Sequence, residues 1–175
     1  MESTFNTLYS ADIQRNNTGG GGYILRFLWL LRKAHTTKSK IIRFFCARLL
    51  RRYRLKYGLE ISHFTRIGKG LYLGHAFNIT INPMASIGDN CNIHKGVTIG
   101  QENRGKRKGV PQIGNRVYIG VNSTVSGAVV VGDDVLIAPN CHVNCNVPSH
   151  SVVFGNPCII KHRDNATEGY ITDLV

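Results

Sequence analysis

The sequence lacks the features that would place it in several common protein classes. Its five cysteines are odd in number and form no C-x-x-C pair, so they match neither a disulfide framework nor a zinc site. Its most apolar stretch, residues 23–31, contains Arg26 and falls well short of the about 20 apolar residues that cross a bilayer. Its 19 glycines follow no three-residue period, which excludes collagen. We therefore expect reduced thiols and a cytoplasmic protein.

Acidic residues are absent from one part of the chain. Residues 23–57 hold eleven Lys or Arg and no Asp or Glu, whereas residues 61–175 hold ten bases and seven acids. Most of the net charge of +12 therefore belongs to the N-terminal part. Nothing in this part resembles a recognition helix or an RNA-binding signature, so we expect no nucleic-acid partner.

What the sequence does contain is a repeat of six residues. A period of six does not fit a helix, but it suits a coil of three short strands with about 18 residues per turn, in which the aliphatic side chains stack inside. A Greek-key sandwich is the alternative, and it would show a period of two. The repeat predicts an all-β fold, a parallel β-helix of four to five coils about 4.8 Å apart. The repeated positions are Ile61, Ile67, Leu73, Ile79, Ile81, Ile87, Ile93, Ile99, Ile113, Ile119, Val125, Val131, Ile137 and Val143.

Three stretches inside the repeat carry a resemblance to a known family: LGHAFNI at 73–79, GVTIG at 96–100 and GNPCII at 155–160. Over roughly residues 58–162 the chain resembles the hexapeptide-repeat acyltransferases. Within them it resembles the serine acetyltransferase-like branch, which includes O-acetyltransferases of capsular polysaccharide synthesis. The resemblance implies a left-handed β-helix, a homotrimer, acetyl-CoA as co-substrate, and a direct transfer that needs no metal.

Acetyl transfer to an alcohol needs a base, and histidine can accept a proton near neutral pH. His75 follows the inward Leu73 by two residues, at an expected coil corner, and the resemblance implies that it is the catalytic base. Glu60 stands 15 residues earlier, where serine acetyltransferases carry an aspartate, and would hold the imidazole in place. An ordinary surface role for Glu60 remains the alternative. We expect His94 and Asn78 to line the acceptor site, and a plain corner position is the alternative for His94.

The resemblance also places the CoA molecule in a groove between adjacent β-helices. Backbone amides of the later coils would contact its pantetheine arm, with Gly120, Ser126 and Ala138 as the candidates, and Lys161 is the candidate for its phosphates. The repeat is interrupted by an insertion at 100–112, whose bases include Lys106 and Lys108. These lysines would attract the phosphates of CoA or an anionic acceptor, unless the insertion is only a solvated loop.

One departure from the family bears on the acceptor. Serine acetyltransferases place an Arg-His pair just before the proline of the insertion, where this chain has Gly109 and Val110 before Pro111. Without that pair the carboxylate of an amino acid has no evident partner, and burying it unpaired would be costly. We therefore predict acetylation of a sugar hydroxyl, free or lipid-linked, in surface polysaccharide synthesis. Serine O-acetylation is the enzymatic alternative, and a non-catalytic β-helix scaffold is the alternative of another class.

The flanking segments complete the predicted organisation. Residues 1–22 are predicted to form a flexible tail, 23–58 a basic amphipathic helical segment, 59–162 the β-helix, and 163–175 a C-terminal tail. In 23–57 the cations and aromatics suit a helix lying on the inner face of the cytoplasmic membrane. A helix packed on the base of the β-helix explains the same pattern, and the sequence leaves both open.

Overall fold

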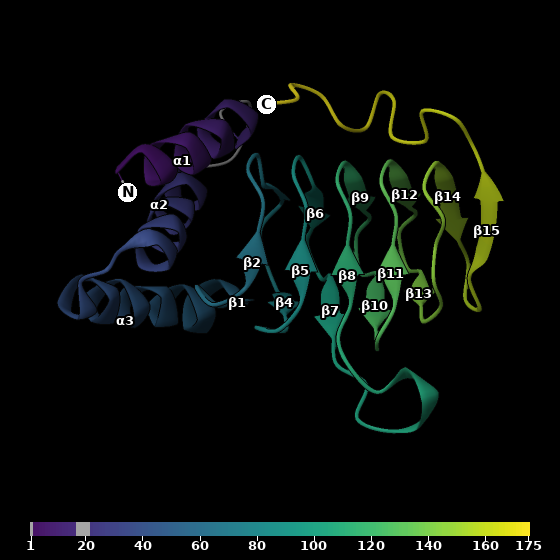
Figure 1. Cartoon of the computed structure of the whole chain (residues 1–175), viewed down its shortest axis with the longest axis horizontal. Coiled ribbons are helices and arrows are strands. Elements are labelled where there is room, and N and C mark those ends of the chain that lie inside the picture. Colours follow the sequence, from purple (N-terminus) through teal and green to yellow (C-terminus); the bar gives the residue numbers. More distant parts are fainter. Residues whose placement is uncertain (1, 17–21) are drawn as a thin grey trace.

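The computed structural model describes residues 2–16 and 22–175. In these residues three helices, α1 (Glu2–Asn16), α2 (Gly22–Thr36) and α3 (Lys40–Tyr57), precede a stack of short strands (Figure 1). The strands are β1 (Leu59–Ile61), β2 (Arg66–Ile67), β3 (Tyr72–Gly74), β4 (Ile79–Ile81), β5 (Ser86–Ile87), β6 (Asn92–His94), β7 (Thr98–Gly100), β8 (Gln112–Ile113), β9 (Val117–Ile119), β10 (Thr124–Ser126), β11 (Val130–Val131), β12 (Val135–Ile137), β13 (His142–Val143), β14 (Ser151–Phe154) and β15 (Ile159–His162).

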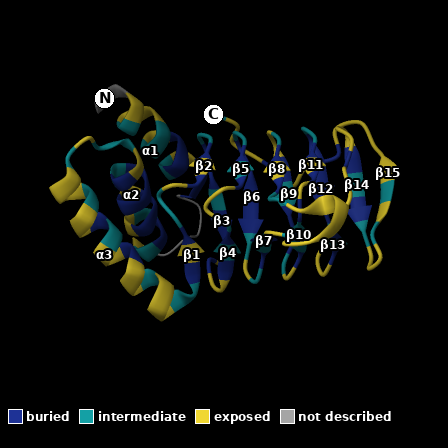
Figure 2. Cartoon of the chain, turned by 60° about the horizontal axis from the view of Figure 1, so that its bottom comes forward, coloured by how far each residue is buried: buried dark blue, intermediate teal, exposed yellow. Residues whose placement is uncertain are grey.

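The strands form three sheets that the chain visits in turn. The first sheet has the order β1-β4-β7-β10-β13, the second β2-β5-β8-β11, and the third β3-β6-β9-β12-β14-β15. Neighbouring strands pair in parallel, and the pair β14–β15 is antiparallel. The predicted left-handed parallel β-helix is confirmed. All fourteen aliphatic residues of the six-residue repeat are buried, so the repeat marks the residues that fill the interior of the coil (Figure 2).

The base of the β-helix is covered by α2. Its apolar face is buried against the first coils through residues such as Phe27, Leu28 and Leu31. The helix α3 ends at Tyr57 and is capped by Gly58, whose φ of 66° is left-handed, and β1 begins at Leu59. No helix among the described residues is long and apolar enough to cross a membrane.

The helix α1 corrects the prediction of a flexible tail over 1–22. Residues 2–16 are helical, and residues 1 and 17–21 lie outside the described residues. The helix has no apolar periodicity, so no hydrophobic pattern predicted it. It docks instead through buried polar side chains: the Asp12 Oδ1 accepts from the Leu71 N–H at 2.9 Å, and the Asn16 Oδ1 accepts from the Leu73 N–H at 3.1 Å. These bonds satisfy backbone at the edge of the third sheet, which would otherwise be unpaired.

The C-terminal segment 163–175 runs back over the coils from β15 towards α1 (Figure 1). Its main anchor is the buried carboxylate of Asp134, which accepts hydrogen bonds from the backbone N–H groups of Ala166 and Thr167 and from the Thr167 hydroxyl at 2.6 Å. Further along, the Asn92 Nδ2 donates to the Tyr170 carbonyl at 3.0 Å. The segment predicted as a tail is therefore fastened to the third sheet.

We predict that acid releases this segment. Burial would raise the pKa of Asp134, but the hydrogen bonds from Thr167, His150 and Ala166 outweigh it, and the pKa lies below its ordinary value of 3.8. A depressed carboxyl pKa contributes stability that is complete above pH 3.8 and is lost as the pH falls through the folded value. The protection factors of the amides in residues 163–175, that is, their exchange rates relative to the unstructured chain at the same pH, should therefore fall below about pH 4. In Asp134→Asn these protection factors should already be low at pH 6; an unchanged wild-type protection factor at pH 3 would contradict the prediction.

Candidate active site

His75 stands at the corner between β3 and β4, exposed to solvent. Its φ of 51° lies in the left-handed region, and the neighbouring Ala76 side chain is fully buried. The corner is fixed to the next coil because the Gly74 carbonyl accepts from Lys95 N–H and the Phe77 carbonyl accepts from Gly96 N–H, both at 3.0 Å. A rigid corner therefore presents an accessible imidazole, as general base catalysis requires.

His94 lies one coil below, directly beside Gly74. The two residues are paired in register, and a Cβ built on Gly74 would fall 2.3 Å from the His94 Nδ1. Only glycine leaves space for this ring. The His94 Nε2 is buried and has no hydrogen-bond partner in the described part of the chain. Burial, and then the nearby His75, lower the pKa of His94, so its imidazole is neutral at pH 7.

On its other side, His94 borders a small polar cavity over the third sheet. The cavity has a volume of about 270 Å³ and is lined by tyrosines as well as by Arg15 of α1. The ring centroids of His94 and Tyr118 are 4.7 Å apart, and Tyr118 in turn contacts Tyr170 of the C-terminal segment at 5.1 Å. His94 thus connects the His75 corner with this cavity. Asn78, the other predicted acceptor residue, is exposed at the end of the His75 corner with a φ of 54°.

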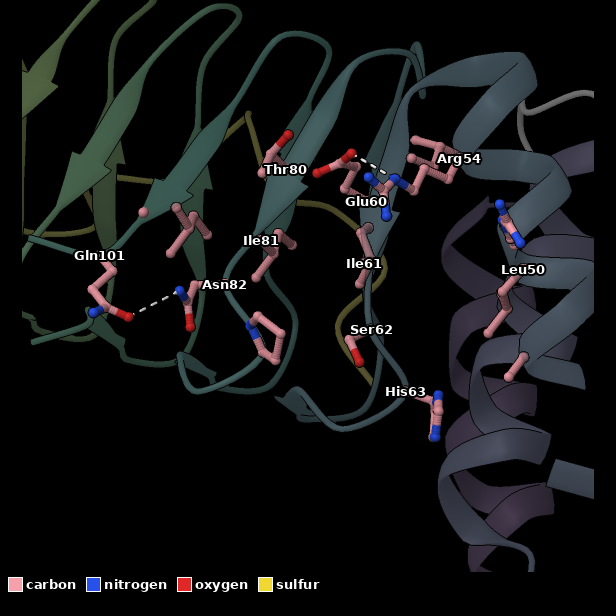
Figure 3. A pocket seen from close by; sticks show the side chains of 16 residues that line it. Leu50, Arg54, Glu60, Ile61, Ser62, His63, Thr80, Ile81, Asn82 and Gln101 are labelled. Carbon is pink, nitrogen blue, oxygen red and sulfur yellow. Dashed lines mark hydrogen bonds and ion pairs between the residues drawn. The ribbon is translucent and has the colours of Figure 1, made fainter. Parts of the chain in front are cut away.

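Glu60 has a different partner from the one predicted. Its Oε1 lies 2.7 Å from the Arg54 Nε of α3, and both side chains are partly exposed (Figure 3). No hydrogen bond or ion pair joins Glu60 to His75 within the described residues. Figure 3 shows Glu60 on the outer face of the first sheet, turned towards α3. The pairing of Glu60 with His75 therefore stays a prediction, and it would require Glu60 to leave Arg54.

Glu60 belongs to a groove of about 630 Å³ between α3 and the outer face of the first sheet. Polar side chains follow one another across it from coil to coil: Glu60 lies beside Thr80 in register, and the Asn82 Nδ2 donates to the Gln101 Oε1 at 3.5 Å (Figure 3). These neighbours of Glu60 were not predicted. The signal was available, since outward positions of adjacent coils are separated by about one turn of the repeat.

Two of the backbone amides predicted to contact CoA already donate hydrogen bonds within the β-helix. The Gly120 N–H donates to the Ile137 carbonyl and the Ala138 N–H to the Val153 carbonyl, both at 2.8 Å. Each amide is part of the bonding between coils, because corner backbone in a β-helix pairs with the coil above. Gly120 has a packing role, since a Cβ there would fall 2.6 Å from the Pro139 nitrogen.

The remaining CoA candidates carry free or partly free side chains. The Ser126 Oγ is 3.1 Å from the His142 Nε2, and the Lys161 Nζ lies 5.8 Å from the centre of the Phe154 ring. Lys106 and Lys108 are exposed in the insertion, which is closed by paired hydrogen bonds between Glu102 and Gly109. These four residues stay predictions.

The insertion and His75 lie at opposite ends of the strands of the first sheet. His75 precedes β4, where the strands of this sheet begin, whereas the insertion follows β7, where they end. Figure 1 shows the insertion projecting away from the coils. One chain therefore does not place its own insertion over its own His75 corner.

A comparison with characterised proteins now identifies the family. The serine acetyltransferase of Helicobacter pylori (strain ATCC 700392 / 26695) is 36% identical over 125 residues, which cover 71% of this chain and 73% of that protein. The chain belongs to the serine acetyltransferase family. As a member of this family of hexapeptide-repeat enzymes it is an acyltransferase, and the scaffold alternative finds no support. The capsular polysaccharide branch is not supported by the comparison either.

Solved structures of serine acetyltransferases share the fold. The soybean apoenzyme superposes with a TM-score of 0.78 at 24% identity, covering 91% of this chain and 69% of the soybean chain. A serine acetyltransferase in complex with CoA gives a TM-score of 0.76 at 21% identity, covering 91% of this chain and 71% of that one. No protein-family model matches the sequence.

Proposed function

We propose that the chain transfers an acetyl group from acetyl-CoA to a hydroxyl oxygen, with His75 as the general base. The exposed imidazole on a rigid corner, in a chain of the serine acetyltransferase family, is the observation that carries this proposal. His75 removes the hydroxyl proton while the oxygen attacks the thioester carbonyl. The new C–O bond forms, the C–S bond breaks, and the CoA sulfur leaves and takes up the proton as a thiol. This direct attack needs neither a metal nor an acyl-enzyme.

Serine is the acceptor that the relatives favour. The Helicobacter pylori relative is a serine acetyltransferase, and the soybean enzyme has been solved in complex with serine. The relatives therefore favour serine O-acetylation over the predicted acetylation of a sugar hydroxyl.

A sugar hydroxyl remains the second candidate because of the local structure at 109–110. A Cβ on Gly109 would fall 2.9 Å from the Ala128 Cβ, so the insertion closes too tightly there for a larger side chain. Val110 packs against the core. Neither position offers a polar group that would bind the carboxylate of an amino acid, and a sugar has no carboxylate to be bound.

Release of CoA thiol, measured with each acceptor in turn, decides between the two. We expect turnover with serine or with a nucleotide-linked or lipid-linked sugar, and the kcat/KM values should differ by at least about 100-fold between classes, because a site built for one polar group rejects a ligand lacking it. Val110→His restores the histidine that serine acetyltransferases carry before the proline, and it should raise kcat/KM for serine if serine is the acceptor. Hydrolysis of acetyl-CoA without acetylation of any hydroxyl would overturn the proposal.

We propose further that the active form is a homotrimer. Its support is the separation of His75 from the insertion in one chain, because a neighbouring subunit can bring its own insertion to the His75 corner. Sedimentation equilibrium should give three times the chain mass of 19.4 kDa, and a monomer that turns over at full rate would contradict it.

A membrane surface is the proposed partner of α3. The structure divides segment 23–57, because α2 buries its apolar face on the β-helix whereas α3 buries only Cys46 and Leu50 (Figure 2). The outward face of α3 combines four large apolar side chains that are more than half exposed with cations, and it has no acid. A second copy docking there would oppose like charges, whereas anionic lipid would attract them. The apolar residues are Ile41, Phe44, Phe45 and Leu55, and the cations of the helix are Lys40, Arg43, Arg48, Arg51, Arg52, Arg54 and Lys56.

Vesicle flotation tests this partner. The chain should float with vesicles that contain phosphatidylserine and stay behind with pure phosphatidylcholine. The variant Phe44→Ser/Phe45→Ser should lose most of the binding, because two interfacial aromatics are removed. Phe64→Ser, which changes an equally exposed phenylalanine outside α3, should bind like the wild type. Equal binding of both vesicle types, or of neither, would contradict the proposal.

A further inference from the structure

Two cysteines that are distant in the sequence meet at the far end of the β-helix. Cys145 follows β13, Cys158 lies in the turn between β14 and β15, and their Sγ atoms are 3.8 Å apart. Cys145 is exposed and Cys158 is partly exposed. They are 13 positions apart, so no sequence spacing signals the pair.

The other three cysteines are unlike this pair. Cys46, Cys91 and Cys141 are buried, and burial raises the pKa of Cys91 to about 12. A buried thiol is inert, because a reagent in solution cannot reach its sulfur. Reaction with a reagent in solution is therefore confined to Cys145 and Cys158.

The neighbourhood of the pair includes a cation from the insertion. Burial and the adjacent Cys158 raise the pKa of Cys145, while the Arg107 guanidinium acts in the opposite direction. The backbone of Arg107 is fixed here, since its carbonyl accepts from the Ala128 N–H at 2.8 Å. The cation offsets only part of this rise in pKa, so its main effect is to attract anionic reagents to the exposed pair.

We propose that Cys145 and Cys158 are a redox modification site that forms a reversible intramolecular disulfide by exchange with an anionic low-molecular-weight disulfide such as oxidised glutathione. One cysteine thiolate attacks a sulfur of the reagent, a protein–glutathione S–S bond forms, and one glutathione leaves as a thiolate that takes up a proton. The second cysteine then loses its proton and attacks the protein sulfur, releasing the second glutathione. The two cysteines are oxidised by two electrons, and one oxidised glutathione becomes two reduced ones.

The geometry allows this bond with a small movement. The Sγ atoms must approach from 3.8 Å to about 2.05 Å, which exposed side chains can achieve by rotation about χ1. The bond would join the corner after β13 to the turn that holds β15, the antiparallel strand at the open end of the third sheet. Oxidation would therefore fasten the C-terminal hairpin, which also carries Lys161, to the last coil.

Intact-mass spectrometry of the native full chain with oxidised glutathione tests this proposal. The wild type should lose about 2 Da, and its two fast-reacting thiols should fall to none. Cys145→Ser and Cys158→Ser should each stop at one glutathione adduct, about 305 Da heavier, because the resolving thiol is absent. Oxidation should raise the Tm of the wild type by about 5 °C, and dithiothreitol should reverse the shift.

Two results would overturn the proposal. One is a wild type that accumulates two glutathione adducts, which would mean that the thiols react but do not reach each other. The other is a wild type that keeps two free thiols while a denatured sample is oxidised under the same conditions. Neither readout depends on acetyl transfer, so the result is independent of the proposed function.

Discussion

His75→Asn is expected to lower kcat for acetyl transfer by about 100-fold to 10,000-fold, because the only change is the loss of the general base. Asparagine is the suitable replacement, since it tolerates the left-handed backbone that His75 adopts at φ 51° better than alanine does. The corner should therefore keep its shape. Steady-state release of CoA thiol at saturating acetyl-CoA measures the effect.

The matched control is His35→Asn. His35 is exposed at the end of α2, where its Nδ1 lies 2.9 Å from the His63 carbonyl, and it has no place in the proposed site. The kcat of His35→Asn should stay within about two-fold of the wild-type kcat, as for other surface changes. If His75→Asn retained wild-type kcat while remaining folded, the mechanism would be wrong and His94 would become the next candidate for the base.

Asp12→Ala should destabilise the fold by about 3–5 kcal/mol, because it leaves a buried guanidinium unpaired. The Asp12 carboxylate receives two hydrogen bonds from Arg32, at 2.7 and 3.0 Å, and both side chains are at most 2% exposed. The same change removes the acceptor of the Leu71 N–H. Urea denaturation followed by circular dichroism gives the free energy of unfolding.

The double variant Asp12→Ala/Arg32→Met distinguishes a lost ion pair from general damage to the helix. Replacing both partners removes the unpaired charge, so the double variant should be more stable than Asp12→Ala alone. It will not regain wild-type stability, since Arg32 also donates to the carbonyls of Ile67 and Gly68. If Asp12→Ala lowered the free energy of unfolding by less than about 0.5 kcal/mol, the change would be no larger than that of an ordinary surface substitution, and the prediction would be contradicted.

The six-residue period in the sequence was sufficient to predict the coil. Each aliphatic residue of the repeat is buried because every side of the coil is a short strand that points one aliphatic side chain into the interior. One side of the coil takes about six residues, so this relation is local in the sequence. His75 could be placed at a corner for the same reason, since it follows the inward Leu73 by two positions. These are local relations, and local relations can be read from one sequence.

The tertiary structure alone decided the contacts that cross between coils or between coil and helix. The docking of α1 through Asp12 and Asn16, the pairing of Glu60 with Arg54 and the meeting of Cys145 with Cys158 all join residues without a shared period. The hydrogen bond from the Gly120 N–H could not be predicted from the sequence either, because the register of the stacked coils determines that its partner is the Ile137 carbonyl. A sequence pattern records which side of the coil a residue faces, but a polar contact depends on distance and direction, which only the folded chain defines.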